Sequence, residues 1–250
     1  MLTLKKSLGQ HFLKDQTICV RIVEALQNHP FRQLLEVGPG GGALTKYLNE
    51  IPGIDFKLVE IDKEKIAFLA STYPNLQTHI VEGSILEVPC PFTGKFTMIG
   101  NFPYNISTQI VFRVIEWREQ VQTMIGMFQK EVAERICAKS GTKDYGIISV
   151  LVQAYFETNY LFDVDETAFN PPPKVKSGVI ALRYKGNPYQ IENHKKFSVL
   201  VKTAFSQRRK QLRNPLKGFF DKAVLADDIF TKRAEQLSVE DFVHLLKIMK

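Results

Sequence analysis

Short apolar runs alternate with amphipathic segments along much of the chain, and this alternation limits the folds open to it. Runs typical of strands occur at residues 33–37, 56–61, 77–82, 96–100 and 123–128. Helical patterns lie between most of them, at residues 42–50, 62–71 and 106–117. Strands that alternate with helices form a parallel sheet covered on both faces. The sequence therefore predicts an α/β fold.

The pattern changes after about residue 145. Two β-rich runs, at residues 145–164 and 177–184, are joined by a segment that contains three consecutive prolines, Pro171 to Pro173. We expect these runs to form an antiparallel hairpin added to the edge of the sheet. Beyond residue 185 the chain is helical in pattern, with helices expected near residues 193–207, 208–219 and 238–249. We therefore divide the chain into one domain of residues 1–186 and a second of residues 187–250.

The second domain is strongly basic. Residues 186–250 hold 13 Lys and Arg against 7 Asp and Glu, which accounts for +6 of the net charge of +7. No acidic residue lies between Glu192 and Asp221, a stretch whose cations include Lys202, Arg208, Arg209, Lys210, Arg213 and Lys217. A solvated helix face is one interpretation. A polyphosphate partner is the interpretation we favour, because charges of one sign repel each other unless an anion faces them.

Several classes of protein are excluded by composition. No apolar run approaches the roughly 20 residues that cross a bilayer, and the first residues, MLTLKKSLGQHFLKD, have no apolar signal core. The three cysteines are scattered and have no CxxC spacing, which indicates reduced thiols, no disulfide framework and no metal site. We expect a cytoplasmic protein that does not enter a membrane.

A glycine-rich turn stands between the first strand and the next helix, in LLEVGPGGGALTKYL. Gly38 and Gly40 let the backbone bend and let a ligand approach closely. About twenty residues later the second strand ends with Glu60, which could accept hydrogen bonds from ribose hydroxyls. Alternatively, the glycines only form a tight turn between strand and helix, and Glu60 is an ordinary surface residue that binds no ligand. A dinucleotide and S-adenosylmethionine both fit these features, and Pro39 favours the second because it removes one N–H from a loop that would hold pyrophosphate.

Asn101-Phe102-Pro103-Tyr104 lies where another buried strand ends and a helix begins. The amide, the two aromatic rings and the rigid proline of this corner suit a planar amine, whose N–H bonds need acceptors that orient it. The Asn101 side-chain oxygen and the Phe102 carbonyl, whose direction Pro103 restricts, could each accept one N–H. The rings of Tyr104 and Phe169 are candidate stacking faces for such a planar group. A core position at the end of a hairpin is the alternative for Phe169.

Six segments occur in order along the chain: GQHFL (9–13), EVGPG (36–40), EID (60–62), NFPYNIS (101–107), FNPPPKVKSGV (169–179) and FSQRRKQLRN (205–214). Together they resemble the bacterial small-subunit ribosomal RNA adenine dimethyltransferases, from about residue 5 to the end. The resemblance implies a Rossmann-like class I methyltransferase sheet with a small helical C-terminal domain. It also implies a monomer that transfers methyl groups from S-adenosylmethionine to N6 of two adjacent adenosines near the 3′ end of 16S rRNA, within the small ribosomal subunit.

The resemblance also assigns site residues. It implies contacts to S-adenosylmethionine from the following positions, to which the glycine turn adds Gly40: His11, Leu13, Gly38, Glu60, Ser84 and Asn101. Two of these depart from the family, which usually has Asn at the position of His11 and Asp at that of Ser84. A serine hydroxyl brings no charge, and a charge-assisted hydrogen bond is about twice as strong as a neutral one. We therefore expect weaker cofactor binding.

The six cations named above, from Lys202 to Lys217, form the basic run of the second domain. We expect RNA phosphates to contact this basic run and Lys174, with Lys5 and Lys6 as further candidates. Three other functions remain open on the sequence. One is the related adenine N6-methyltransferase that acts on 23S rRNA, and FSQRRKQLRN and PPPKVKSGV favour the small-subunit group over it. The others are an RNA-binding ribosome-assembly factor without catalysis and a dinucleotide oxidoreductase.

Overall fold

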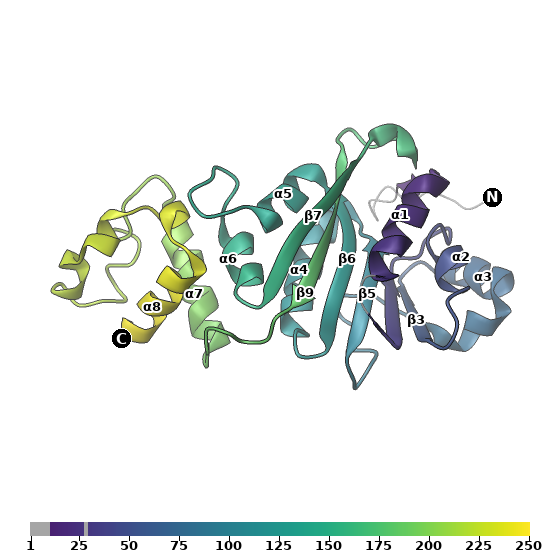
Figure 1. The fold of residues 1–250 in the computed structure, drawn as a ribbon, viewed down its shortest axis with the longest axis horizontal. Helices are drawn as coiled ribbons and strands as arrows, with labels where there is room; N and C mark the ends of the chain where they lie inside the picture. Colours follow the sequence, from purple (N-terminus) through teal and green to yellow (C-terminus); the bar gives the residue numbers. More distant parts are fainter. Residues whose placement is uncertain (1–10, 28–29) are drawn as a thin grey trace. The chain divides into compact units, whose positions relative to one another are not determined.

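The computed structural model describes residues 11–27 and 30–250, so Lys5 and Lys6 lie outside the described part of the chain. The chain divides into two compact units (Figure 1). The first unit comprises the residues up to Ala133 together with Thr158–Tyr184, and the second comprises Glu134–Glu157 and Lys185–Lys250. No helix in the described ranges is long and apolar enough to cross a membrane.

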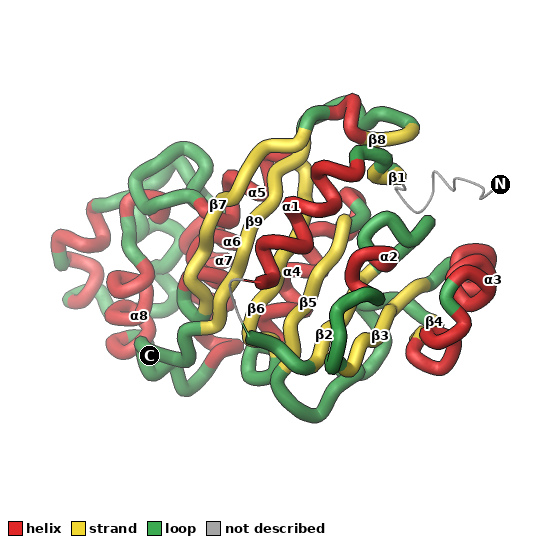
Figure 2. The backbone as a smooth tube through the Cα atoms, turned by 45° about the vertical axis from the view of Figure 1, so that its right-hand side comes forward, coloured by secondary structure: helices red, strands yellow, loops and turns green. Residues whose placement is uncertain are grey.

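A seven-stranded sheet has the order β4-β3-β2-β5-β6-β9-β7 (Figure 2). Its strands are β2 (Gln33–Val37), β3 (Asp55–Glu60), β4 (Ile80–Glu82), β5 (Phe96–Asn101), β6 (Val121–Gln129), β7 (Phe156–Val164) and β9 (Ser177–Tyr184). The five strands from β4 to β6 pair in parallel, and β9 pairs antiparallel with β6. The expected α/β fold, with an antiparallel addition at one edge, is confirmed.

Helices cover both faces of this sheet. They are α1 (Gln16–Gln27), α2 (Thr45–Leu48), α3 (Lys63–Thr72) and α4 (Ser107–Glu116). In Figure 1, α1 lies in front of the strands and α4 behind them. Cys19, Ile22 and Leu26 of α1 are buried and recur at intervals of three and four residues, which places them on one helix face. They share a core with strand residues such as Ile99 and Met127, so the face of α1 that meets the sheet is apolar.

The strand order reverses between β2 and β5. After β2 the chain continues outward to β3 and β4, and it then returns to β5 on the other side of β2. In open α/β sheets, ligands bind at such a reversal, beyond the carboxyl ends of the strands. The glycine turn follows β2 and the Asn-Phe-Pro-Tyr segment follows β5, so the topology brings these two segments together.

A separate two-stranded sheet joins the start of the described chain to the segment before β9. In it, β1 (Phe12–Leu13) pairs antiparallel with β8 (Phe169–Asn170), and Leu13 lies opposite Phe169. The N–H groups of Lys14 and Asp15 both donate to the Ala168 carbonyl, at 2.9 and 3.3 Å. Backbone hydrogen bonds therefore hold residues 12–15 in place.

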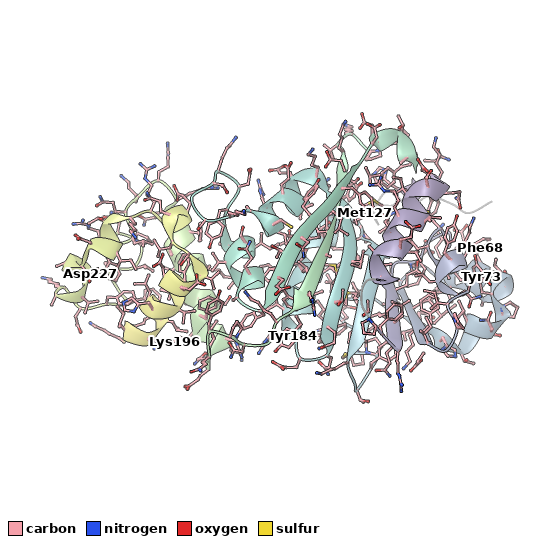
Figure 3. The ribbon with its side chains drawn as sticks, in the orientation of Figure 1. Phe68, Tyr73, Met127, Tyr184, Lys196 and Asp227 are labelled. Atoms are coloured by element: carbon pink, nitrogen blue, oxygen red, sulfur yellow. The ribbon has the colours of Figure 1, made fainter. Side chains whose placement is uncertain are left out.

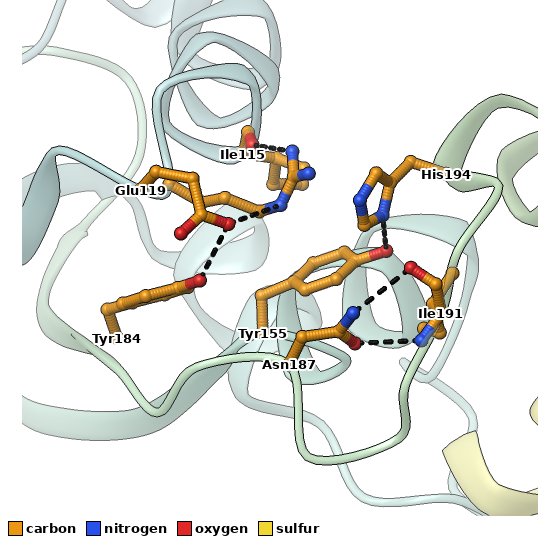
Figure 4. A network of polar contacts seen from close by, with 8 residues as sticks. Ile115, Glu119, Tyr155, Tyr184, Asn187, Ile191 and His194 are labelled. Carbon is orange, nitrogen blue, oxygen red and sulfur yellow. Dashed lines mark hydrogen bonds and ion pairs between the residues drawn. The ribbon is translucent and has the colours of Figure 1, made fainter.

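The second unit is helical. It contains α6 (Ile147–Gln153), α7 (His194–Phe205) and α8 (Val239–Ile248), and α5 (Lys130–Cys137) ends in it. Short 3₁₀ turns lie at Val224–Ala226, Asp228–Thr231 and Ala234–Gln236. The hydroxyl of the buried Tyr155 is hydrogen-bonded to Nδ1 of His194 at 2.7 Å, which ties the segment after α6 to the start of α7 (Figure 4).

Three of the expected elements differ in the structure. Of the strand expected at residues 77–82, only Ile80–Glu82 forms β4, and the residues before it end a 3₁₀ helix, Pro74–His79. Residues 147–153 form α6 rather than a strand, and the strand begins only at Phe156. Ile147–Gln153 is apolar nearly throughout, and a buried helix cannot be distinguished from a buried strand by periodicity in such a run. Residues 208–219 form a series of turns rather than a helix. Pro215 lacks an N–H and disfavours helical geometry at Asn214.

The division into units also differs from the one based on sequence. Both place a boundary close to residue 185, but residues 134–157 belong to the second unit. The apolar α6 accounts for this difference, because Val150, Leu151 and Val152 are buried and α6 packs with α7.

Candidate functional site

A cavity of about 200 Å³ lies at the carboxyl ends of the strands around the reversal between β2 and β5. Its walls come from β1, the glycine turn, the end of β3, residues 83–85 and the Asn-Phe-Pro-Tyr segment. All seven positions expected to bind the cofactor line it: His11, Leu13, Gly38, Gly40, Glu60, Ser84 and Asn101. Residues that are up to 90 positions apart in the sequence thus meet around one space.

The glycine turn needs glycine at three positions, Gly38, Gly40 and Gly42. Gly38 has a φ of +66° and Gly40 a φ of +55°, values in the left-handed region that side chains disfavour. The Gly38 N–H donates to the Val59 carbonyl at 2.9 Å, which joins the turn to β3. A Cβ on Gly40 would lie 3.3 Å from the Phe12 ring. Farther along the same loop, Gly42 has a φ of +77°, and a Cβ there would lie 3.4 Å from the ring of Tyr73. Tyr73 directly follows α3 (Figure 3).

Glu60 organises the end of β3. Its side chain is almost fully buried, with 4% of its surface exposed. Oε1 accepts hydrogen bonds from the N–H groups of Ile61 and Asp62, both at 2.9 Å, and Oε2 accepts one from Gly40 at 3.1 Å. A carboxylate has about four acceptor positions, so these three bonds leave one for a ligand. Glu60 thereby links β3 to the glycine turn.

Glu36, which sequence reasoning did not assign to the site, also lines the cavity. It is buried in β2, and Oγ1 of Thr45 donates to its Oε2 at 2.7 Å. Burial raises the pKa of Glu36 to about 8, and the nearby Glu60 carboxylate adds to the increase. Glu36 is therefore mostly protonated at pH 7. An acidic residue within an otherwise apolar strand, two positions before the glycine turn, was the available signal.

Residues 83–85 and Ile61 form a further wall of the cavity. The Ser84 hydroxyl accepts a hydrogen bond from the Leu86 N–H at 3.2 Å, and the Ser84 carbonyl accepts from Glu87 and Val88, both at 2.9 Å. Ser84 therefore caps a turn as well as facing the cavity. Ile61 is 51% exposed, and with the buried Ile85 it supplies apolar surface that sequence reasoning missed.

Asn101 is held by the chain's first described residue. Its Nδ2 donates to the His11 main-chain carbonyl at 3.1 Å, so this contact does not depend on which side chain stands at position 11. No residue in the described ranges donates to Asn101 Oδ1, which remains an acceptor at the cavity wall. The main chain of His11, the residue before β1, therefore fixes the direction of the Asn101 side chain.

The Phe102 ring is buried and anchors the corner that follows β5. A Cβ on Gly100 would lie 2.6 Å from this ring and a Cβ on Gly126 2.4 Å from it, so both strands need glycine beneath the ring. The Phe102 N–H donates at 3.2 Å to the carbonyl of Met127, which lies on the central strand β6 (Figure 3). The backbone before Pro103 is therefore fixed from both sides.

Tyr104 is more constrained than a free stacking face. Its hydroxyl lies 2.5 Å from Oγ of Ser177, which is fully buried, and burial raises the pKa of Tyr104. The His11 ring stacks on the Tyr104 ring, with centroids 5.4 Å apart and planes at 29°. Nδ1 of His11 is in turn hydrogen-bonded to the Pro171 carbonyl at 3.0 Å. A base that used the same face of Tyr104 would displace His11.

The prediction that Phe169 offers an open stacking face is not met by this structure. Phe169 is 1% exposed and belongs to the core that also contains Leu13 and Val179. Its place in β8, paired with β1, turns the ring inward. In this structure Phe169 is therefore a core residue, which was the alternative to a stacking role.

The predicted phosphate contacts lie on the surface. Lys174 is exposed between β8 and β9. Every cation of the basic run is exposed in the second unit: Lys202, Arg208, Arg209, Lys210, Arg213 and Lys217. Within residues 11–27 and 30–250, no group of three His, Cys, Asp or Glu side chains could hold a metal ion.

The fold and the site together define a Rossmann-like class I methyltransferase. The whole chain, residues 1–250, matches the family model described as ribosomal RNA adenine dimethylase. The chain belongs to this family, and it is an enzyme that dimethylates adenines of ribosomal RNA. Membership decides against the oxidoreductase and against a factor without catalysis.

Individual relatives of the chain have names that match this family. The chain is 48% identical over 249 residues to the ribosomal RNA small subunit methyltransferase A of Cytophaga hutchinsonii, covering 98% of this chain and 96% of that one. It is 51% identical to the protein of that name from Flavobacterium johnsoniae, covering 96% and 94%.

Two solved structures resemble the chain at 25% identity. A dimethyladenosine transferase from Plasmodium falciparum has a TM-score of 0.81 and covers 96% of this chain and 99% of its own. The 23S rRNA methyltransferase ErmE has a TM-score of 0.71 and covers 95% and 99%. The higher identity to the small-subunit enzymes favours 16S over 23S rRNA as the substrate.

Proposed function

We propose that the protein uses S-adenosylmethionine to dimethylate N6 of two adjacent adenosines near the 3′ end of 16S rRNA. It acts as a monomer on the small ribosomal subunit, in the cytoplasm, during ribosome biogenesis. One observation carries the proposal: a free acceptor on Asn101 lies on the wall of the same cavity as the glycine turn and Glu60. The relatives named as small-subunit methyltransferases support the choice of substrate.

The cavity has the chemistry that an adenosine with a charged amino-acid tail requires. Glu60 retains an acceptor for a ribose hydroxyl, and the glycine turn leaves backbone exposed to a close ligand. Ile61 and Ile85 offer apolar surface to an adenine ring, and the Ser84 hydroxyl can hydrogen-bond to the ring's edge. His11 and Leu13 close the cavity from the side of β1.

The residues after β5 orient the target amine. When bound, S-adenosylmethionine supplies a methyl group on a sulfonium, which is a good leaving group and needs no acid. In the first transfer, Asn101 Oδ1 and the Phe102 carbonyl accept the two N–H bonds of the amine, which draws the nitrogen lone pair out of conjugation with the ring. As the C–S bond breaks and the C–N bond forms, the neutral thioether leaves, and the methylated nitrogen loses one proton to solvent. In the second transfer, one of the two acceptors holds the single N–H that remains. Pro103 and the buried Phe102 ring keep these acceptors fixed. Such positioning can lower a barrier by several kcal/mol.

The RNA is held elsewhere as well. The flipped base takes the place of the His11 ring on Tyr104, and this stacking offsets part of the few kcal/mol that unstacking costs. Lys174 and the exposed basic run contact phosphates, which supply affinity without reading sequence. A folded RNA recognised through its backbone and shape suits such a distribution of cations.

Unmethylated small subunits incubated with labelled S-adenosylmethionine test the proposal, with the modified bases mapped afterwards. We expect two dimethylated adjacent adenosines near the 3′ end of 16S rRNA, and a loss of rate by orders of magnitude for Asn101→Ala with subunit binding retained. Asn159→Ala, an exposed asparagine on β7, is the matched control. Absence of label from 16S rRNA, or near-normal rates for Asn101→Ala, would overturn the proposal.

A further inference from the structure

The loop between α5 and α6, residues 139–145, is bound to the basic run by Arg208. The guanidinium of Arg208 donates through Nη2 to the Lys143 carbonyl, and also to the Tyr145 carbonyl at 3.3 Å. All of these residues belong to the second unit. A side chain that the sequence suggested as a phosphate ligand therefore has two main-chain acceptors within the protein.

The loop is also anchored at two other points. The Gly141 N–H donates to the Glu235 carbonyl at 2.7 Å, in the 3₁₀ region before α8. Tyr145 is buried, and its ring centroid lies 6.3 Å from that of Phe205 at the end of α7. Together with Arg208, these contacts attach the loop to the rest of the helical unit at three points.

Two cations are carried outward on this loop. Lys139 and Lys143 are exposed, as are Arg209 and Lys210 immediately after Arg208. In the described part of the chain, none of these four side chains is paired with a carboxylate. Asp144 is the one acidic residue on the loop. Because Arg208 bonds directly to the Lys143 carbonyl, the loop that carries Lys139 and Lys143 lies next to the segment that carries Arg209 and Lys210.

We propose that the 139–145 loop is a second RNA-contacting element, in which Lys139 and Lys143 bind phosphates beside Arg209 and Lys210, and that Arg208 is a positioning residue that holds the loop there. The inference rests on the proposed function, because it takes the RNA as the partner. It assigns an RNA contact to a segment outside the basic run. It also changes the role of Arg208 from a phosphate ligand to a link between two phosphate-binding segments.

The test is the salt dependence of binding to unmethylated small subunits, measured with the full chain between about 50 and 200 mM salt. Each lost phosphate contact lowers the slope of log K against log salt by about 0.7–0.9. Lys139→Ala/Lys143→Ala should lower the slope by about twice that amount. Lys222→Ala/Lys247→Ala, which removes two exposed lysines of the same unit, is the matched control and should leave it unchanged.

A double-mutant comparison isolates the role of Arg208. If Arg208 positions the loop, Lys139→Ala/Lys143→Ala should have little further effect on the slope in an Arg208→Ala background. Full additivity would show that Arg208 does not act through the loop. An unchanged slope for Lys139→Ala/Lys143→Ala, with a lowered slope for Arg209→Ala/Lys210→Ala, would overturn the inference alone. Unchanged slopes for both pairs would instead count against RNA binding by this unit, and thus against that part of the proposed function.

Discussion

Ser84 lines the cavity at the position where the resemblance to the family predicts an aspartate. Its hydroxyl already accepts the Leu86 N–H, so it offers a ligand little more than a neutral donor. Aspartate can cap the same turn and add an anionic acceptor for an adenine amine. Ser84→Asp should therefore tighten S-adenosylmethionine binding several-fold and leave RNA affinity unchanged, as measured by calorimetry. Unchanged or weaker cofactor binding would contradict the placement of Ser84 at the adenine.

Tyr104 has two separable roles, a ring face and a hydroxyl. Tyr104→Phe keeps the ring but leaves the buried Ser177 hydroxyl without its partner, which should lower the free energy of unfolding by about 1–3 kcal/mol. Its methylation rate should remain close to wild type. Tyr104→Ala should also lose about 1–3 kcal/mol of base stacking, and monomethylated product should accumulate. Urea unfolding and mass-mapped single-turnover products separate the roles; equal rate losses in both variants would refute a stacking role.

Glu36 predicts a pH dependence of stability. Its pKa is near its ordinary value of 4.5 in the unfolded chain and about 8 in the folded protein. The folded state therefore keeps a proton that the unfolded state loses, and the contribution of Glu36 to stability falls as pH rises from about 4.5 to 8. Glu36→Gln removes this titration and keeps an acceptor for Thr45. In urea unfolding from pH 5 to 9, the free energy of unfolding of the variant should rise relative to that of wild type as pH increases. If the two free energies changed in parallel with pH, the raised pKa of Glu36 would be contradicted.

Among the elements, β5 and β6 support the corner through their glycines. An alanine at Gly126 would place its Cβ 2.4 Å from the Phe102 ring and 2.6 Å from the Phe128 ring. Overpacking of this kind costs about 1–3 kcal/mol and shifts side chains. Gly126→Ala should lower both the free energy of unfolding and the methylation rate. Gly218→Ala, where a Cβ meets open space, is the control. A stable variant with full activity would show that the Phe102 ring does not fix the corner.

The elements also show what sequence could predict. The strands next to the cavity were predictable, because their short apolar runs alternate with helical patterns and end at Gly38, Glu60 and Asn101. The α6 helix was not, since its apolar residues fit either a helix or a strand. The burial of Phe169 depends on the pairing of β1 with β8, between segments far apart in the sequence. The hydrogen bond from Tyr104 to Ser177 has the same origin. Contacts of this kind leave no local pattern.

At the scale of the whole molecule, the cavity and most of the positive charge belong to different units. Every residue that lines the cavity belongs to the first unit, whereas residues 186–250 of the second carry +6 of the net charge. Cofactor binding and RNA affinity should therefore respond to different substitutions. The separation also predicts how kinetic constants divide, since cations outside the unit that holds the cavity contribute to binding of the RNA and not to the orientation of the amine.

Arg209→Ala/Lys210→Ala/Arg213→Ala tests this separation. The variant should raise the concentration of small subunits needed for half-maximal rate by at least tenfold at 150 mM salt, because three phosphate contacts are lost. Its single-turnover rate at saturating subunits should stay within about twofold of wild type, and its affinity for S-adenosylmethionine should not change. Asn101→Ala should show the opposite pattern, a low saturating rate with normal half-saturation. If the triple variant lost its saturating rate instead, these cations would take part in placing the target base, and affinity and chemistry would not be separate in this enzyme.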